Sequence, residues 1–254
     1  MILTIEIGNA TITLGGVEGE EVRFECRINT DRVKTSDTYC IDLKTLFEIY
    51  SIGLGSIEGV IIASVVPQVL NAVRNAIIKL LGKEPLVVEP GLKTGLNIRL
   101  DSPAQMGADL VAADVAALRE HKPPLIIIDM GTATTISVLD ETGAHLGGCV
   151  CPGVKISLDA LTARTALLPG IQLESPRQAL GRNTGDAMRS GIMFGNAAML
   201  DGMIDRFREE LGCEFTILAT GGIARHIVPL CRHEILFDRH LIIKGLAALY
   251  RMNA

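Results

Sequence analysis

The chain has little with which to bind nucleic acid. It contains no tryptophan, aromatic residues make up only 4% of its 254 residues, and its formal net charge is -5. Proteins that bind nucleic acid neutralise phosphates with clustered Lys and Arg, and many stack bases on aromatic rings. Because the sequence has neither a basic block nor many aromatic side chains, we predict no nucleic-acid partner.

The sequence also lacks a long hydrophobic run. Although 48% of the residues are hydrophobic, no apolar stretch reaches the roughly 18 residues that a membrane-spanning helix needs. Glu6 falls where a signal peptide would have its apolar region. We therefore expect a cytoplasmic protein without a membrane partner, with enough apolar residues for one large or two ordinary cores.

Familiar metal, disulfide and nucleotide motifs are missing too. None of the six cysteines forms a Cys-x-x-Cys motif, and Cys149 and Cys151 are too close for an ordinary disulfide or a four-ligand zinc site. We expect reduced, mostly buried thiols. There is no Gly-x-x-x-x-Gly-Lys-(Ser/Thr) phosphate loop. Residues 53–59 resemble a dinucleotide loop only loosely and precede a strand, so we interpret them as a linker.

What the chain does contain is a duplicated turn. Residues 3–11 (LTIEIGNAT) are matched by residues 126–134 (IIIDMGTAT), each an apolar run that ends in a carboxylate and a glycine turn. The pattern predicts two β-hairpins whose tips expose backbone amides for phosphate oxygens, with a carboxylate beside each tip for a cation. One such turn alone is more often ordinary turn chemistry, but two copies favour a duplicated half.

A second pair of segments recurs in the same order. Residues 59–67 and 215–223 are each typical of a buried strand that runs into small residues and then a helix. Other elements follow from periodicity and from breakers such as Gly82. Strands are expected at 22–28, 86–88 and 147–151, and helices near 43–50, 69–81, 108–120, 155–168 and 186–211, with a last helix through Leu246 and Tyr250.

The best domain boundary is the pair Pro123-Pro124, which breaks the chain just before the second copy. We expect an N-terminal domain of residues 1–121 and a C-terminal domain of residues 122–254. The alternation of strands and helices predicts an α/β protein.

The chain resembles the type III pantothenate kinases, of the actin-like ATPase superfamily, from its first strand to its last helix. Besides the two turns, the resemblance rests on short motifs in a fixed order: Thr30-Asp31-Arg32, SVVP at 64–67, GLNIR at 95–99, Gly107-Ala108-Asp109, Gly147-Gly148, Pro152-Gly153, GRNT at 181–184 and Thr220-Gly221-Gly222. It implies two duplicated ribonuclease-H-like domains, each a mixed sheet flanked by helices, with a cleft between them.

The activity that the resemblance implies is transfer of the γ-phosphoryl group of ATP to pantothenate. The product would be 4'-phosphopantothenate, in the first step of coenzyme A biosynthesis. Magnesium and a monovalent cation, potassium or ammonium, are the implied cofactors. The resemblance also implies a homodimer whose active site is completed near the subunit interface.

The resemblance assigns roles to particular residues. ATP would be held by Glu6, Ile7, Gly8, Asn9, Ala10, Thr11, Ile12, Thr13 and Thr132. Pantothenate would be bound by Leu100, Gly107, Ala108, Asp109, Leu110 and Thr184, with Asp129 as the ligand of the monovalent cation. Asp109 matches the family's proton acceptor.

Two of the candidate residues also have plain structural interpretations. Asp109 lies at the start of a predicted helix, where the helix N-terminus favours its charged form, but a helix N-cap at this position is an equally good explanation. Arg32 is an additional candidate for contact with an anion. Its alternative is a solvated surface arginine beside Asp31.

Four positions depart from the family pattern. Glu6 stands in place of Asp, Ala10 of Thr, Leu100 of Tyr and Leu110 of Arg. The longer Glu6 side chain could displace a magnesium-bound water. Loss of a charged contact at Leu110 would cost about 1.5–3 kcal/mol of binding. Two alternatives therefore stand beside the kinase: a weakened paralogue with a binding or regulatory role, and a kinase for a different small alcohol.

Overall fold

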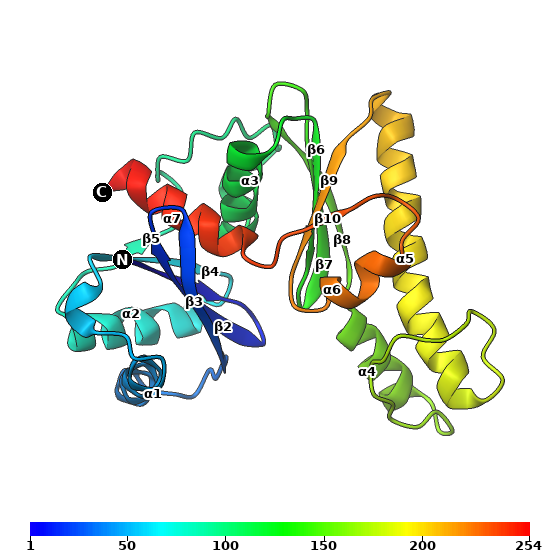
Figure 1. The fold of residues 1–254 in the computed structure, drawn as a ribbon, viewed down its shortest axis with the longest axis horizontal. Coiled ribbons are helices and arrows are strands. Elements are labelled where there is room, and N and C mark those ends of the chain that lie inside the picture. The colour runs from blue at the N-terminus through cyan, green and yellow to red at the C-terminus, as the bar shows by residue number, and fades with distance from the viewer. The chain divides into compact units, whose positions relative to one another are not determined.

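The computed structural model describes residues 1–254, which form two compact units. The first unit consists of Met1–Leu96, Asp101–Glu120 and His240–Ala254, and the second of Asn97–Leu100 and His121–Arg239. Each unit has one five-stranded sheet with helices packed on it, shown by element label in Figure 1.

The sheet of the first unit has the strand order β3-β2-β1-β4-β5. Its strands are β1 (Ile2–Ile7), β2 (Thr11–Glu18), β3 (Glu21–Asn29), β4 (Gly59–Ser64) and β5 (Leu86–Val87). The first three form an antiparallel meander, and β4 and β5 add in parallel on the other side of β1. Strand β1 is central because five of its six residues are buried, as its nearly continuous apolar sequence requires.

The sheet of the second unit repeats this topology, in the order β10-β9-β6-β7-β8. Its strands are β6 (Leu125–Met130), β7 (Ala133–Leu139), β8 (His145–Pro152), β9 (Thr216–Thr220) and β10 (Leu236–Phe237). Again three strands form an antiparallel meander, and β9 adds in parallel to β6, just as β4 adds to β1. The predicted α/β fold, with two duplicated mixed sheets, is confirmed.

Four helices cover the first sheet. Helices α1 (Ser36–Ile49) and α2 (Pro67–Leu81) pack on one face, and α7 (Leu241–Asn253) packs on the other together with α3 (Ala108–Glu120). The core between the sheet and the first two helices is aliphatic except for two buried rings, Tyr39 and Phe47, on α1.

In the second unit, helices α4 (Val154–Arg164), α5 (Thr184–Leu211) and α6 (Ala224–Ile227) enclose a separate core. Short 3-10 turns complete the chain at Leu54–Ser56, Pro103–Gln105 and Val228–Leu230. Helix α4 ends four residues earlier than predicted. Thr165 has an extended backbone there, and its hydroxyl donates to the carbonyl of Leu161 at 2.7 Å, which ends the helix.

Packing divides the chain differently from the predicted boundary at residues 121 and 122. The last helix, α7, belongs to the first unit because it packs against α3 and β1, and the red helix lies beside the blue strands in Figure 1. Residues 97–100 belong to the second unit. The boundary at residues 121 and 122 therefore stays a prediction about the two duplicated halves of the sequence. The packed units differ from these halves, because the first unit includes His240–Ala254 and the second includes Asn97–Leu100.

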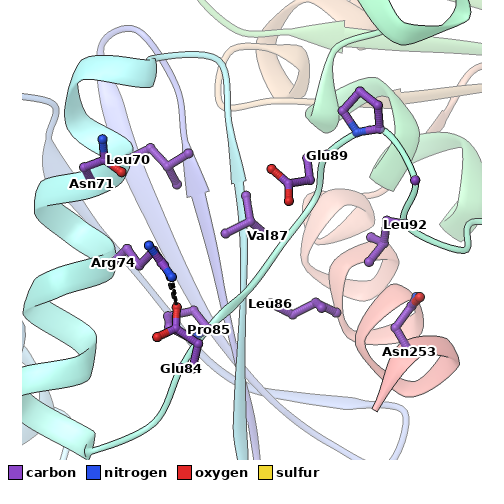
Figure 2. Close-up of a pocket in the computed structure, with 12 residues that line it drawn as sticks. Leu70, Asn71, Arg74, Glu84, Pro85, Leu86, Val87, Glu89, Leu92 and Asn253 are labelled. Carbon is purple, nitrogen blue, oxygen red and sulfur yellow. Dashed lines mark hydrogen bonds and ion pairs between the residues drawn. The ribbon is translucent and has the colours of Figure 1, made fainter.

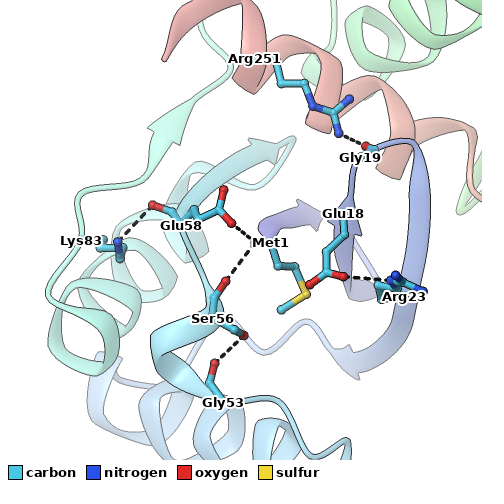
Figure 3. Close-up of polar contacts among 9 residues, drawn as sticks. All are labelled: Met1, Glu18, Gly19, Arg23, Gly53, Ser56, Glu58, Lys83 and Arg251. Atoms are coloured by element: carbon cyan, nitrogen blue, oxygen red, sulfur yellow. Dashed lines mark hydrogen bonds and ion pairs between the residues drawn. The ribbon is translucent and has the colours of Figure 1, made fainter.

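The start of β1 is held by polar contacts that Figure 3 shows. The α-amino group of Met1 donates to Glu58 Oε1 at 2.6 Å and to the carbonyl of Ser56 at 3.0 Å. The amino group lowers the pKa of the Glu58 carboxyl, chiefly through that hydrogen bond. Arg251 of α7 reaches the carbonyl of Gly19 at the β2–β3 turn. Both contacts join segments distant in sequence to the same end of the sheet.

None of the helices is both long enough and apolar enough to cross a membrane.

Helix α7 can approach α3 closely only because residue 245 is glycine. A Cβ at Gly245 would overlap the backbone carbonyl of Ala112, which cannot move without displacing α3. We predict that Gly245→Ala lowers the free energy of unfolding by about 1–3 kcal/mol. Gly202→Ala, in α5, is the matched control, because open space surrounds it and helix propensity should raise stability by up to about 1 kcal/mol. Urea unfolding of both variants tests this, and equal effects would contradict the close packing.

Candidate functional site

The first predicted phosphate turn connects β1 to β2. Ile7 pairs with Ile12, so residues 8–11 form the tip, closed by a hydrogen bond from the amide of Gly8 to the carbonyl of Thr11 at 3.0 Å. Asn9, Ala10 and Thr11 are exposed, whereas Ile7, Ile12 and Thr13 are buried. The buried strands thus hold a small tip whose backbone is open to a ligand.

Thr30, which follows β3, holds this tip by two hydrogen bonds. Thr30 donates from its hydroxyl to the carbonyl of Gly8 at 2.6 Å, and from its amide to the carbonyl of Ala10 at 3.0 Å. Tyr39 of α1 in turn holds Asp31, accepting its amide at 3.0 Å and donating to its carbonyl at 2.7 Å. The sequence did not predict these roles of Thr30 and Tyr39, although the Thr30-Asp31-Arg32 motif marks the segment.

The second turn connects β6 to β7 and is one residue shorter. Met130 pairs with Thr134, which leaves residues 131–133 as the tip. Gly131 and Thr132 are exposed at this tip. Behind it lies Gly153, at the start of α4, where a Cβ would overlap the carbonyl of Thr132. Glycine at 153 therefore lets the helix start pack directly against the turn.

The carboxylates of the two turns occupy equivalent places. Glu6 Oε1 and Asp129 Oδ2 each lie 3.9 Å from the point where a Cβ would sit on the turn glycine, Gly8 or Gly131. Both side chains are half-buried. The extra methylene of Glu6 does not take its carboxylate away from the turn.

Oxygen atoms converge beside Asp129. Gly221 follows β9 with a φ of +97°, and a Cβ there would lie 2.5 Å from the carbonyl oxygen of Met130 and 2.8 Å from Asp129 Oδ1. The Met130 carbonyl and the Asp129 carboxylate thus pack against the backbone of Gly221 more closely than any larger residue would allow. Oxygen donors of this kind are the ligands of hard cations.

Asp109 is not the N-cap of its helix. Helix α3 begins at Ala108, so Asp109 lies inside the first turn, and its Oδ1 accepts the amide of Leu110 at 2.9 Å. A Cβ at Gly107 would overlap that same oxygen. Glycine at 107 therefore leaves room for the carboxylate, which is half-buried, as is the side chain of Leu110.

Leu100 ends a short segment, Asn97–Leu100, that is hydrogen-bonded to the second unit. Residues 97–99 bond to His145, with the amide of His145 donating to the carbonyl of Asn97 at 2.8 Å and the amide of Arg99 donating to the carbonyl of His145 at 2.9 Å. Arg99 also donates to Asp140 Oδ2 at 3.0 Å. A Cβ on Gly147 would lie 3.6 Å from Cδ2 of Leu100, which is an ordinary van der Waals contact.

Thr184 is the first residue of α5 and is exposed. The preceding residue, Asn183, is the N-cap, and its side chain accepts the amide of Asp186 at 2.9 Å. Gly181 lets the loop lie against the helix, because a Cβ there would overlap the backbone of Ala187. The predicted residues therefore fall in two groups: 6–13 and 107–110 in the first unit, and Leu100, Asp129, Thr132 and Thr184 in the second.

Two surface pockets of the first unit contain none of these residues. Figure 2 shows one of them, which lies around Val87 of the edge strand β5, with the ion pair of Arg74 and Glu84 on one side and Asn253 on the other. The other adjoins Met1 and Tyr250. Neither holds a predicted site residue.

Three of the six cysteines have thiols whose pKa is raised. All six are free thiols, and burial raises the pKa of Cys26 and Cys149 to about 11 and that of Cys231 to about 12. A thiol with such a pKa is protonated at neutral pH and is a poor nucleophile. The structure holds no group of three or more His, Cys, Asp or Glu side chains that could bind a metal ion.

Comparison with known proteins identifies the family. The family model described as type III pantothenate kinase matches residues 2–206. The chain belongs to the type III pantothenate kinase family. A type III pantothenate kinase of Exiguobacterium sp. is 41% identical over 253 residues, covering 100% of this chain and 99% of that relative. One from Moorella thermoacetica is 40% identical over 253 residues and covers 100% of both chains.

Solved structures that resemble the chain share its fold. An activator of 2-hydroxyisocaproyl-CoA dehydratase from Clostridium difficile, solved with bound ADPNP, has a TM-score of 0.57 at 14% identity, covering 98% of this chain and 93% of that one. A polyphosphate/ATP-glucomannokinase from Arthrobacter sp. strain KM has a TM-score of 0.53 at 15% identity, covering 100% and 99%. The family resemblance and the actin-like fold expected from the sequence are confirmed.

The space that Gly107 leaves for Asp109 yields a prediction. Gly107→Ala should turn the Asp109 carboxylate aside, because that side chain can move more easily than the backbone. The resemblance implies that Asp109 is the proton acceptor, so its displacement should lower the kcat of pantothenate phosphorylation by about tenfold to 100-fold, with the melting temperature nearly unchanged. Steady-state kinetics and thermal unfolding measure the two. An unchanged kcat would show that the position of the carboxylate is not critical.

Proposed function

We propose that this chain transfers the γ-phosphoryl group of ATP to the primary hydroxyl of pantothenate, forming 4'-phosphopantothenate in the first step of coenzyme A synthesis. The observation that carries the proposal is the family match over the whole length of relatives about 40% identical to the chain. The duplicated turns and the carboxylate on α3 supply the groups that phosphoryl transfer to an alcohol needs.

The backbone amides of the two turns are the phosphate-binding groups in this proposal. Residues 6–13 and Thr132 bind the nucleotide phosphates, with the exposed tips presenting their amides and hydroxyls. Amides fixed by buried strands need no reorganisation as charge develops on the phosphoryl oxygens. The hydrogen bonds from Thr30 keep the first tip in shape between turnovers.

Asp109 accepts the proton of the substrate hydroxyl. The transition state of phosphoryl transfer is loose, so the hydroxyl proton leaves late and little basicity is required. Orientation matters more, and the bond from the amide of Leu110 fixes the carboxylate. Gly107, Ala108, Leu110, Leu100 and Thr184 contact pantothenate. With leucine at 100 and 110, this pocket is more apolar than the family pattern.

Magnesium fits Glu6, because its carboxylate stays beside the first turn and hard cations prefer carboxylate oxygens. When bound, magnesium neutralises charge on the phosphates. A monovalent cation, potassium or ammonium, is assigned to Asp129, whose carboxylate lies near the carbonyl oxygen of Met130.

We further infer a homodimer in the cytoplasm. Five large apolar side chains of the second unit are exposed along β8, α4 and the loop between α4 and α5: Val150, Ile156, Leu161, Leu167 and Leu180. Large exposed apolar side chains suit burial in an interface, and a second copy of the chain is the partner that the family suggests. Six free thiols fit a reducing compartment.

The test of the reaction is ADP release in the presence of pantothenate, magnesium and potassium. We expect turnover by the natural chain and a loss of about 100-fold or more in kcat for Asp109→Asn, because the proton acceptor is removed. Asp37→Asn is the matched control, an exposed carboxylate in the first turn of α1. Absence of turnover by the natural chain would refute the kinase and favour the weakened paralogue. Turnover with another alcohol but not with pantothenate would show that the chain is a kinase for that alcohol.

The cation site predicts a dependence on salt type. Activity in potassium or ammonium chloride should exceed activity in choline chloride, and Asp129→Asn should abolish the difference by removing the carboxylate that faces Gly221. Initial rates at constant ionic strength measure it. Equal rates in all three salts would exclude a role for the cation.

The dimer predicts a mass in solution of twice the 27.2 kDa chain. Val150→Asp should shift the protein toward the monomer, since a buried carboxylate would oppose association. Ile49→Asp, on the exposed face of α1, is the control. Light scattering after size exclusion gives the mass. A monomeric natural chain, or equal effects of both variants, would overturn this interface.

A further inference from the structure

Arg32 lies at the tip of the first turn. Its Nη2 donates to Asn9 Oδ1 at 3.3 Å, and Asn9 is one of the exposed residues at the tip. The segment that carries Arg32 follows β3, the strand farthest from β1 in its meander, so this contact joins residues 23 positions apart. The guanidinium is thereby held by the side chain of a residue at the tip.

The backbone around Arg32 is fixed, although the side chain itself is exposed. Buried Tyr39 holds the amide and the carbonyl of Asp31 through its hydroxyl. Thr30 binds both sides of the turn. The base of the Arg32 side chain is therefore anchored to the same structure as the turn, and the long side chain loses less freedom on contact with a ligand than one on a mobile loop.

The charge of Arg32 is not neutralised by the protein. The carboxylate of neighbouring Asp31 accepts the amide of Val33 at 2.9 Å, and Arg32 has no ion pair. Two arginines of the adjacent strand differ in this respect, since Arg23 pairs with Glu18 and Glu21, and Arg27 with Glu25. With no ion pair to break, the guanidinium is available to an anion.

A guanidinium has five N–H donors, of which Asn9 takes one. The remaining donors suit phosphate oxygens, which arginine binds in a fork of two parallel hydrogen bonds. The turn itself offers no hydroxyl at Ala10 and no basic side chain among residues 6–13. Arg32 thus supplies a positive charge that the turn itself lacks.

We propose that Arg32 binds the phosphate groups of the nucleotide at the first turn, held in readiness by Asn9. This inference rests on the proposed kinase function. It adds a phosphate-binding residue that lies outside the turn sequence.

Binding of ADP and of adenosine to the purified protein separates this role from a structural one. For Arg32→Gln we expect the Kd of ADP, with magnesium present, to rise by about tenfold, the loss of one exposed charge-assisted contact, while the Kd of adenosine stays unchanged. In the phosphorylation assay the KM for ATP should rise and the KM for pantothenate should not. Arg32→Lys should recover part of the affinity, since it keeps the charge but not the fork.

Arg23→Gln is the matched control, an exposed arginine of the same unit that should leave ADP affinity unchanged. An unchanged ADP affinity in Arg32→Gln would overturn the inference. So would an equal loss for adenosine and ADP, which would mean that the side chain only supports the fold of the turn. If the natural chain binds ADP but phosphorylates nothing, the proposed function fails while the comparison of ADP with adenosine still decides the role of Arg32.

Discussion

The structure depends on the burial of one strand at the centre of each sheet. Strands β1 and β6 lie between an antiparallel and a parallel neighbour, and five of the six residues in each are buried. The half-buried residue is in each case the carboxylate, Glu6 or Asp129, one position before the strand ends. Burial therefore fixes the register that brings the acid and the glycine turn to the same end of the sheet.

The two turns then differ in what supports them. Thr30, which follows the edge strand β3, bonds to the first tip, whereas the second rests on the start of α4 through Gly153. The first tip is one residue longer. An ancestral duplication explains the common topology, and these supports show how the halves have diverged.

Local patterns predicted much of the fold. The helix over Ala108–Glu120 and the stop at Gly82, with its φ of +66°, follow from periodicity and from glycine chemistry. The duplicated turns follow from sequence identity. What escaped prediction depends on contacts distant in sequence: the return of α7 to the first unit, the hydrogen-bonded segment at 97–100, and the bonds of Thr30 and Tyr39. No pattern within one element specifies such contacts.

The departures from the family pattern are also clearer in three dimensions. Glu6 keeps its carboxylate at the same distance from its turn glycine as Asp129 does, 3.9 Å from the Cβ position. Asp109 lies in the first turn of its helix rather than at the N-cap, and its catalytic role stays a prediction. Leu100 and Leu110 remain as changes in the pocket proposed for pantothenate.

The central claim is that both turns bind the phosphates of one nucleotide. A crystal structure of the protein with a non-hydrolysable ATP analogue, magnesium and pantothenate tests it most directly. The account predicts phosphate oxygens within hydrogen-bonding distance of amides from residues 8–11 and 131–132, with the pantothenate hydroxyl beside Asp109. An analogue whose phosphates contact neither turn, or only one of them, would contradict it.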